Sequence, residues 1–267
     1  MNLRGASADA LAALSEKLPT SGGKETATLG EELFAVSAVL REQPGLRRVL
    51  TDNSVAAEAK ADLAEQVFAS AVGKPTMQVI SGAAGERWTS SSDLMEALDE
   101  LATRCTVRSG GSDAAKISDE LFAVRRVVHD SSELRDALAD PSRSVADKRE
   151  LLRGLLEKQV LPATMRLVEQ AVAGHDGPMV AALGTAQRRA AAVLDQVVAT
   201  VHTARPLDDE VRTRVTEALG RQYDAHVHVD EVVEPDLVGG MRIEIGADVI
   251  DGTVQSRLDD ARRRLVG

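Results

Sequence analysis

Two histidines and an aspartate alternate along a short stretch near the C-terminus, in the order His226-Val-His228-Val-Asp230. Side chains two positions apart on a β-strand point to the same face. Imidazole and carboxylate groups gathered on one face are ligands that zinc accepts, so a metal-dependent enzyme is one hypothesis. The alternative is a solvated polar strand face. We favour the latter because no second cluster of candidate ligands stands out in the sequence.

Other chemical motifs are missing from the sequence. Gly-Lys occurs at residues 23–24 and 73–74, but neither pair has the earlier glycine or the following Ser/Thr of a phosphate-binding loop. There is also no G-x-G-x-x-G, no H-E-x-x-H and no nucleophile elbow. The sequence therefore predicts no catalytic residue, no metal and no cofactor.

The single cysteine, Cys105, excludes an internal disulfide and is typical of a reducing compartment. It lies near Arg104 and Arg108, and nearby cations could lower the pKa of its thiol. We interpret it instead as a spectator in a helix.

Composition narrows the function classes. The 267 residues are 43% hydrophobic, and no stretch approaches the roughly 18 apolar residues of a membrane span. The first residues lack an apolar core, so we expect no secretory signal. A net charge of −10 with only 2% aromatics argues against a nucleic-acid binder. The length suggests two or three domains of a soluble globular protein.

An internal repeat organises the first two thirds of the chain. Residues 21–86 align without gaps with residues 109–174, a shift of 88, and 21 of the 66 positions are identical. The clearest match is Glu-Leu-Phe-Ala-Val, at residues 32–36 and again at 120–124. Such a register over this length indicates a duplicated structural unit.

Each copy has helical spacing. Apolar residues recur at i, i+4, i+7 and i+11 in both copies, which predicts one buried stripe per helix: Leu29, Leu33, Val36 and Leu40, then Ile117, Leu121, Val124 and Val128. Turn residues follow at 52–54 and 140–142, and Ser144 with Asp147 predicts a capping box. A helix around residues 93–107 could close the first bundle, open the second, or do both.

The pattern changes after residue 195. It predicts a strand at 197–203, a helix at 207–221, strands at 226–230 and 241–245, and a final helix carrying an apolar stripe. The fold class expected is therefore mainly α, with two repeated amphipathic helical bundles followed by a small α+β C-terminal module. The expected domains are residues 1–90, 91–195 and 196–267.

The segment from Val233 to Leu258 carries Gly239-Gly240, an alternating strand, Gly246, and then Val-Ile-Asp251-Gly252-Thr-Val. This order closely resembles the C-terminal signature of the delta subunit of F-type ATP synthases, whose mitochondrial counterpart is the oligomycin-sensitivity-conferring subunit. Ala247 departs from the polar residue common there. The second helical copy resembles the N-terminal six-helix bundle of that family, so the resemblance covers about residues 90–267. The first copy is an addition to the family's usual plan.

The resemblance implies a non-catalytic stator subunit. The family's bundle binds N-terminal helices of α subunits, and its C-terminal domain binds the membrane-anchored b subunit. We therefore expect one copy per complex, at the cytoplasmic face of the cell membrane. The subunit is expected to resist rotor torque during ATP synthesis. We expect it neither to insert into the membrane nor to bind nucleic acid. An unrelated helical-repeat adaptor is the main alternative.

The resemblance also implies contact residues. It places the α-subunit contact on the first and fifth helices of each copy: Leu98, Leu101, Met165 and Val168, with Leu11, Leu14, Met77 and Ile80 in the added copy. The stripe of the last helix suggests the b-subunit contact: Val254, Leu258, Ala261 and Leu265. The signature residues Gly239, Gly240, Gly246, Asp251 and Gly252 are expected to be structural.

Overall fold

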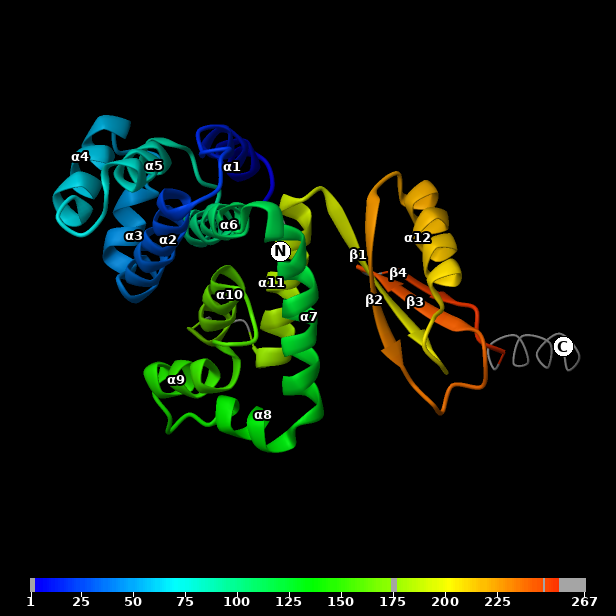
Figure 1. Cartoon of the computed structure of the whole chain (residues 1–267). Coiled ribbons are helices and arrows are strands. Elements are labelled where there is room, and N and C mark those ends of the chain that lie inside the picture. The colour runs from blue at the N-terminus through cyan, green and yellow to red at the C-terminus, as the bar shows by residue number, and fades with distance from the viewer. Residues whose placement is uncertain (1–2, 174–176, 247, 255–267) are drawn as a thin grey trace, which may run out of the picture. The chain divides into compact units, whose positions relative to one another are not determined.

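The computed structural model describes residues 3–173, 177–246 and 248–254 (Figure 1). The chain forms two compact units, Met1–Ala190 and Ala191–Gly267. The described part of the first unit is helical, and that of the second is a small sheet with one helix. This matches the predicted fold class, mainly α with a small α+β module at the C-terminal end.

The helices of the first unit follow one another with short connections. In chain order they are α1 (Ala6–Glu16), α2 (Lys24–Glu42), α3 (Pro44–Leu50), α4 (Ala57–Phe68), α5 (Lys74–Gly85), α6 (Ser91–Ser109), the 3₁₀ turn η1 (Gly111–Asp113), α7 (Ala114–Asp130), α8 (Ser132–Ala139), α9 (Val145–Leu156), α10 (Pro162–Ala173) and α11 (Met179–Val193).

The helices repeat as the sequence does. Shifted by 88 residues, the first residues of α3, α4, α5 and α6 fall on the first residues of α8, α9, α10 and α11. Helices α2 and α7 also correspond, and both predicted stripes are buried, with no member more than 3% exposed. The first copy therefore consists of α1–α6 and the second copy of α6–α11.

Helix α6 belongs to both copies. It packs against α1 and α2 from the first copy and against α7 and α10 from the second. Its buried residues include Leu94, Leu98, Leu101 and Cys105, each no more than 2% exposed. This answers the question that the sequence left open, because the helix closes one bundle and opens the next. Both copies lie within the compact unit Met1–Ala190.

Helices α2 and α6 approach each other closely at Gly30. A Cβ atom on Gly30 would lie 2.8 Å from the Thr106 hydroxyl and 3.0 Å from the Ala102 carbonyl oxygen. Only glycine lets the two backbones come this near. The contact fixes α2 firmly against the shared helix.

Local capping follows the predicted chemistry. Ser144 and Asp147 form the capping box at the start of α9. The Asp52 carboxylate accepts from the Ser54 backbone N–H, and Asp140 does the same for Ser142, each at 2.8 Å. The two copies therefore share the hydrogen bonding of this turn as well as their helices.

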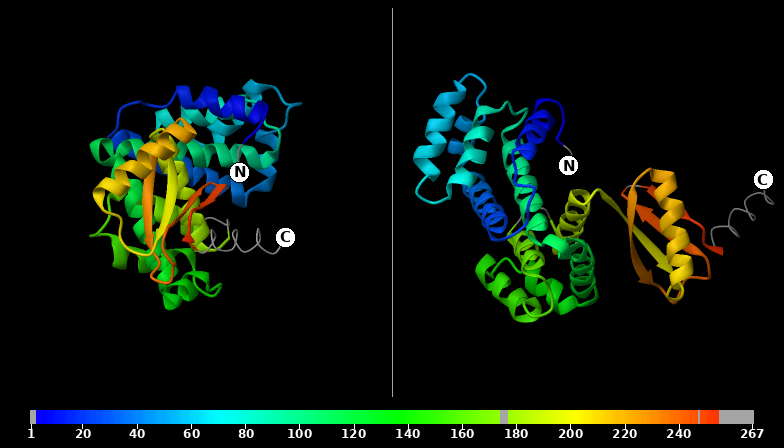
Figure 2. Two further views of the ribbon diagram at one scale, coloured as in Figure 1. Left: turned by 90° about the vertical axis from the view of Figure 1, so that its right-hand side faces the viewer. Right: turned by 45° about the horizontal axis from the view of Figure 1, so that its top comes forward.

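The second unit is a four-stranded sheet with a helix on one face (Figure 2). Its elements are β1 (Gln196–Thr203), α12 (Asp209–Tyr223), β2 (His226–Val233), β3 (Met241–Ile245) and β4 (Asp248–Asp251). The strand order is β2-β1-β3-β4, with β1 and β2 parallel and the other pairs antiparallel. The core lies between the sheet and α12 and includes Ala199, Val201, Leu219, Ile243 and Ile245.

Three of the four strands were predicted, and β4 was not. β4 has four residues and begins and ends with aspartate, so its sequence gives little period-two signal. The helix predicted from Val254 onward lies outside the described residues after its first position.

Candidate functional site

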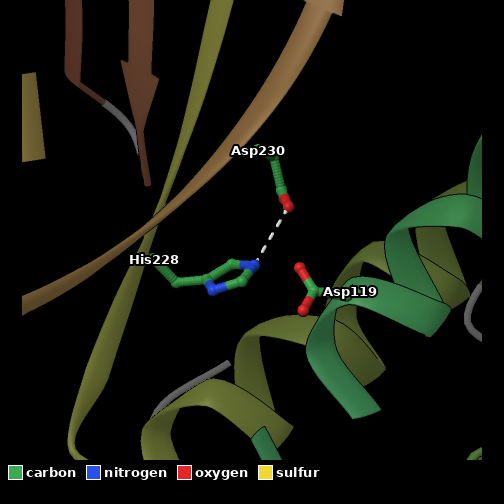
Figure 3. A group of neighbouring side chains, drawn as sticks. All are labelled: Asp119, His228 and Asp230. Carbon is green, nitrogen blue, oxygen red and sulfur yellow. Dashed lines mark ion pairs between the residues drawn. The ribbon is translucent and has the colours of Figure 1, made fainter. Parts of the chain in front are cut away.

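The three candidate metal ligands follow the strand alternation of β2. Its register with β1 places His226, His228 and Asp230 opposite Gln196, Val198 and Thr200. The Nε2 atom of His228 lies 3.3 Å from an Asp230 carboxylate oxygen, an ion pair when the histidine is protonated (Figure 3). His226 is exposed at the start of the strand. Within β2 the structure thus joins two of the three predicted ligands directly to each other.

Cys105 is inaccessible. It is fully buried in α6, and this burial raises the pKa of its thiol to about 11, with Arg108 opposing the shift. Reactive cysteines need a lowered pKa and some exposure. The interpretation of Cys105 as a spectator is therefore consistent with its surroundings.

The residues predicted to contact α subunits occupy two different environments. Leu11 and Met77, in α1 and α5 of the first copy, are half-buried at the surface. The other six are buried, between 0% and 7% exposed: Leu14, Ile80, Leu98, Leu101, Met165 and Val168. These six belong to the core of the free chain, so only Leu11 and Met77 offer side-chain surface to a partner directly.

Helix α2 reaches across the junction between the two copies. Arg41 donates a hydrogen bond to the Asp99 carboxylate at 2.7 Å, and Ser37 donates to the Met95 carbonyl at 3.4 Å, both on α6. Glu31 forms an ion pair with Arg166 of α10. These contacts hold α2 against both α6 and α10.

A small cavity lies at this junction. Its volume is about 50 Å³, and residues of α2, α6, α10 and α11 line it, among them Phe34, Asp99 and Arg189. Burial raises the pKa of Asp99, while Arg41 and Arg189 oppose the shift. The Asp99 side chain is 14% exposed and lines this cavity. The volume of the cavity suits a water molecule better than a larger ligand.

The second unit carries an open groove near its signature glycines. The groove, of about 590 Å³, is lined mainly by small and apolar residues: Thr203, Ala204, Arg205, Leu207, Pro235, Leu237, Gly239, Gly240 and Met241. The Thr203 hydroxyl lies buried there and has no hydrogen-bond partner among the described residues. Val238 directly precedes Gly239, and the Val254 backbone N–H donates a hydrogen bond to the Gly239 carbonyl at 3.2 Å. The two valines are 61% and 42% exposed.

The signature residues shape this end of the module. Gly239, Gly240 and Gly246 have φ of +68°, +80° and +59°, which favours glycine. A Cβ on Gly240 would lie 2.5 Å from the Gly252 carbonyl oxygen, so that position also needs glycine for space. The Asp251 carboxylate accepts from the Thr253 backbone N–H and hydroxyl, at 2.9 and 2.7 Å.

Of the predicted b-subunit contacts, only Val254 is described, and it is exposed. Leu258, Ala261 and Leu265 lie outside the described residues. No helix in the described ranges is long and apolar enough to cross a membrane.

Comparison with known proteins decides the family. A model of the family described as "ATP synthase delta (OSCP) subunit" matches residues 96–265. The chain belongs to this family. An "ATP synthase subunit delta" from Nocardioides sp. is 48% identical, over all of this chain and 98% of that protein. Counterparts from Streptomyces avermitilis and Nocardia farcinica are 39% and 38% identical over 99% and 92% of this chain.

This delta-family chain is a non-catalytic subunit of the peripheral stalk of an F-type ATP synthase. The relatives match it along nearly its full length, including the first copy, whereas the family model begins at residue 96 within α6. The long form with the added copy is therefore shared with these relatives. The alternatives of an unrelated adaptor and a metal-dependent enzyme are set aside.

Sequence reasoning missed the junction of α2 with α6 and α10. One signal was present: Gly30, Phe34, Ser37 and Arg41 form a second stripe on α2, at i, i+4, i+7 and i+11. A search for apolar periodicity does not detect this stripe, because three of its four residues are glycine, serine and arginine.

Proposed function

We propose that this subunit links the catalytic α/β hexamer to the membrane-anchored b subunit, at the cytoplasmic face of the cell membrane. One copy per complex holds the hexamer against rotor torque while ATP is made. The first unit binds N-terminal helices of α subunits, and the second unit binds b. Within this plan, residues 91–195 form the delta-type bundle, residues 1–90 an added bundle, and residues 196–267 the b-binding module.

The observation that carries this proposal is the family membership together with the two separate compact units. A subunit that links two partners needs two binding surfaces that both partners can occupy at the same time. Helical bundles offer grooves for amphipathic helices. The second unit offers the groove beside Gly239 and Gly240 and the exposed Val238 and Val254, and exposed apolar surface of this kind is where partners bind.

Co-purification tests the proposal. The tagged full chain should retain both the α/β hexamer and the soluble part of b. Val238→Asp combined with Val254→Asp should release b and keep the hexamer, because two carboxylates would be buried in an apolar contact. Val127→Asp, at a valine of the first unit whose exposure of 51% lies between those of Val238 and Val254, is the control and should keep b. Failure of the unchanged chain to retain the hexamer would contradict the proposal.

A further inference from the structure

A cluster of charged side chains lies on the sheet face opposite α12. Val201 of β1 belongs to the core beneath α12, so the next residue, His202, lies on the other face. There His202 contacts the carboxylates of Glu234, directly after β2, and of Glu244 on β3. Arg242, which is paired in register with His202, contacts the same two carboxylates. Two basic and two acidic side chains therefore form one group.

The imidazole ring of His202 lies between the two carboxylates. Its Nδ1 atom is 2.6 Å from a Glu234 oxygen, which is a hydrogen bond. Its Nε2 atom is 3.7 Å from a Glu244 oxygen, which is beyond hydrogen-bond distance. This Nε2 atom is buried and has no hydrogen-bond partner among the described residues. Because buried ring nitrogens normally have a partner, the Glu244 carboxylate is the group placed to supply one.

Protonation of His202 completes the cluster. A neutral imidazole donates from one nitrogen only, so when Nδ1 donates to Glu234, the lone pair of Nε2 faces the Glu244 carboxylate. An imidazolium donates from both nitrogens. With the proton the cluster has two positive and two negative groups, and without it Arg242 alone balances both carboxylates. The protonated cluster therefore has balanced charge and one more hydrogen bond.

Two carboxylates elsewhere on this face have partners of their own. On β2, an Asp230 oxygen lies 3.3 Å from the Nε2 atom of His228. On β4, the Asp251 carboxylate accepts from the Thr253 hydroxyl at 2.7 Å. The charge around His202 is therefore set by the cluster itself.

The cluster holds one end of the segment that forms a wall of the groove. Four members of residues 234–240 line the groove: Pro235, Leu237, Gly239 and Gly240. At the start of the segment, the Glu234 side chain is bonded to His202, and its backbone N–H donates to the Thr203 carbonyl at 2.7 Å. At the other end, the Gly239 carbonyl accepts from the Val254 N–H at 3.2 Å. The bond to His202 is thus one of the few contacts that fix this wall.

We propose that His202 is a pH-sensitive switch that controls how firmly residues 234–240 are held beside the groove. Histidine normally changes its charge between about pH 5 and 8. Protonated His202 bridges Glu234 and Glu244 and holds the segment. As the pH rises and the proton is lost, the bridge opens and the segment is held less firmly. The consequence for the partner rests on the proposed function: b binds more tightly at the lower pH, because less of the groove wall must be ordered on binding.

Amide hydrogen exchange of the full chain at about pH 6 and about pH 8, corrected for intrinsic exchange rates, tests the switch. The probes are the backbone N–H groups of Leu237 and Gly239, which donate within the segment at 3.0 and 2.9 Å. Their protection should be at least about threefold greater at the lower pH, as expected for a partly exposed ionic contact. The amide of Val201, in the sheet core, is the internal reference and should change less.

Three variants identify the group responsible. His202→Gln should abolish the pH dependence, because glutamine can still donate to Glu234 but takes up no proton. Glu244→Gln should reduce it, and this side chain is 44% exposed, so the variant folds even if His202→Gln does not. His226→Gln, at an exposed histidine at the start of β2, is the matched control and should keep the full pH dependence.

The outcomes separate the switch from the proposed function. Equal protection at both pH values in the unchanged chain, or a pH dependence that persists in both His202→Gln and Glu244→Gln, would overturn the switch. Retention of b by the tagged chain would stand in either case. Equal affinity of the soluble part of b at both pH values would overturn the control of partner binding. Failure to bind b at either pH, with the expected change in protection, would contradict the proposed b contact and leave the switch in place.

Discussion

The carboxylate of Glu120 accepts a hydrogen bond from the hydroxyl of Thr164, and it also accepts the Leu161 backbone N–H at 2.9 Å. One glutamate oxygen thereby caps the start of α10 from a helix 44 residues away. Glu32 makes the same two bonds in the first copy, to Thr76 and to the Gly73 N–H at 2.9 Å. Both members of this polar contact were kept when the bundle was duplicated.

Glu120→Ala should destabilise the first unit by about 1–3 kcal/mol, because it leaves the buried Thr164 hydroxyl and the backbone N–H of Leu161, just before α10, without their partner. Trp88 is the single tryptophan and is 3% exposed in the first unit, so its fluorescence during urea unfolding reports this change. Glu65→Ala, at an exposed position of α4, is the control and should change stability little. An equal loss in both variants would contradict the capping role.

Much of this arrangement can be predicted from the sequence, and part of it cannot. The buried stripe of Leu29, Leu33, Val36 and Leu40 can be predicted from the spacing of neighbouring residues, and the repeat can be predicted by comparing the sequence with itself. The burial of Leu98 is not, because helical periodicity shows which face is apolar but not which helix covers it. The resemblance likewise gives the same contact positions for both copies, whereas Leu98, Leu101, Met165 and Val168 of the second copy are buried, with α6 shared between the copies.

Gly240→Ala should destabilise the second unit by about 2–4 kcal/mol. The substitution combines a positive φ with a Cβ placed 2.5 Å from the Gly252 carbonyl oxygen. Gly246→Ala is the matched control, since Gly246 has a similar φ of +59° but nothing within 4 Å of its Cβ, and it should cost only about 1 kcal/mol. Hydrogen exchange of the β3 amides measures both, and equal losses would exclude the steric explanation.

Cys105 should resist alkylation in the folded chain. With a pKa of about 11, roughly 0.1% of the thiol is ionised at pH 8, and the sulfur is fully buried. Iodoacetamide should label it quickly in guanidinium chloride and hardly at all in buffer, as followed by mass spectrometry. Rapid labelling of the native chain would show that α6 opens readily from its neighbours.

Asp99→Asn should stabilise the chain at neutral pH. Burial raises the pKa of Asp99 in the folded state, so stability falls as the pH rises from the unfolded pKa to the folded one, and the full penalty remains above it. Below the unfolded pKa the carboxyl is protonated in both states, and the gain should vanish. Urea midpoints followed by Trp88 fluorescence at pH 7 and near pH 3.5 test this, with Asp62→Asn, at an exposed position, as control. A less stable variant at pH 7 would mean that the pair with Arg41 outweighs burial.

Deletion of residues 1–88 should unfold much of what remains of the first unit. A delta-type bundle at residues 91–195 would be expected to survive alone, but α1 and α2 pack on the shared helix, where Leu94, Leu98 and Ala102 are at most 2% exposed. Removing them exposes a continuous apolar face, at a cost of about 1.5–3 kcal/mol for each large side chain. Circular dichroism and binding of a hydrophobic dye measure the loss.

Deletion of residues 1–19 should be milder than deletion of residues 1–88. It removes α1 but leaves α2 packed on α6 and α10. This shorter truncation should therefore keep most of its helix content, as measured by circular dichroism, because α2 still covers part of the apolar face of α6. A loss of helix as large as that of the 1–88 deletion would show that α1, and not α2, keeps the shared helix folded.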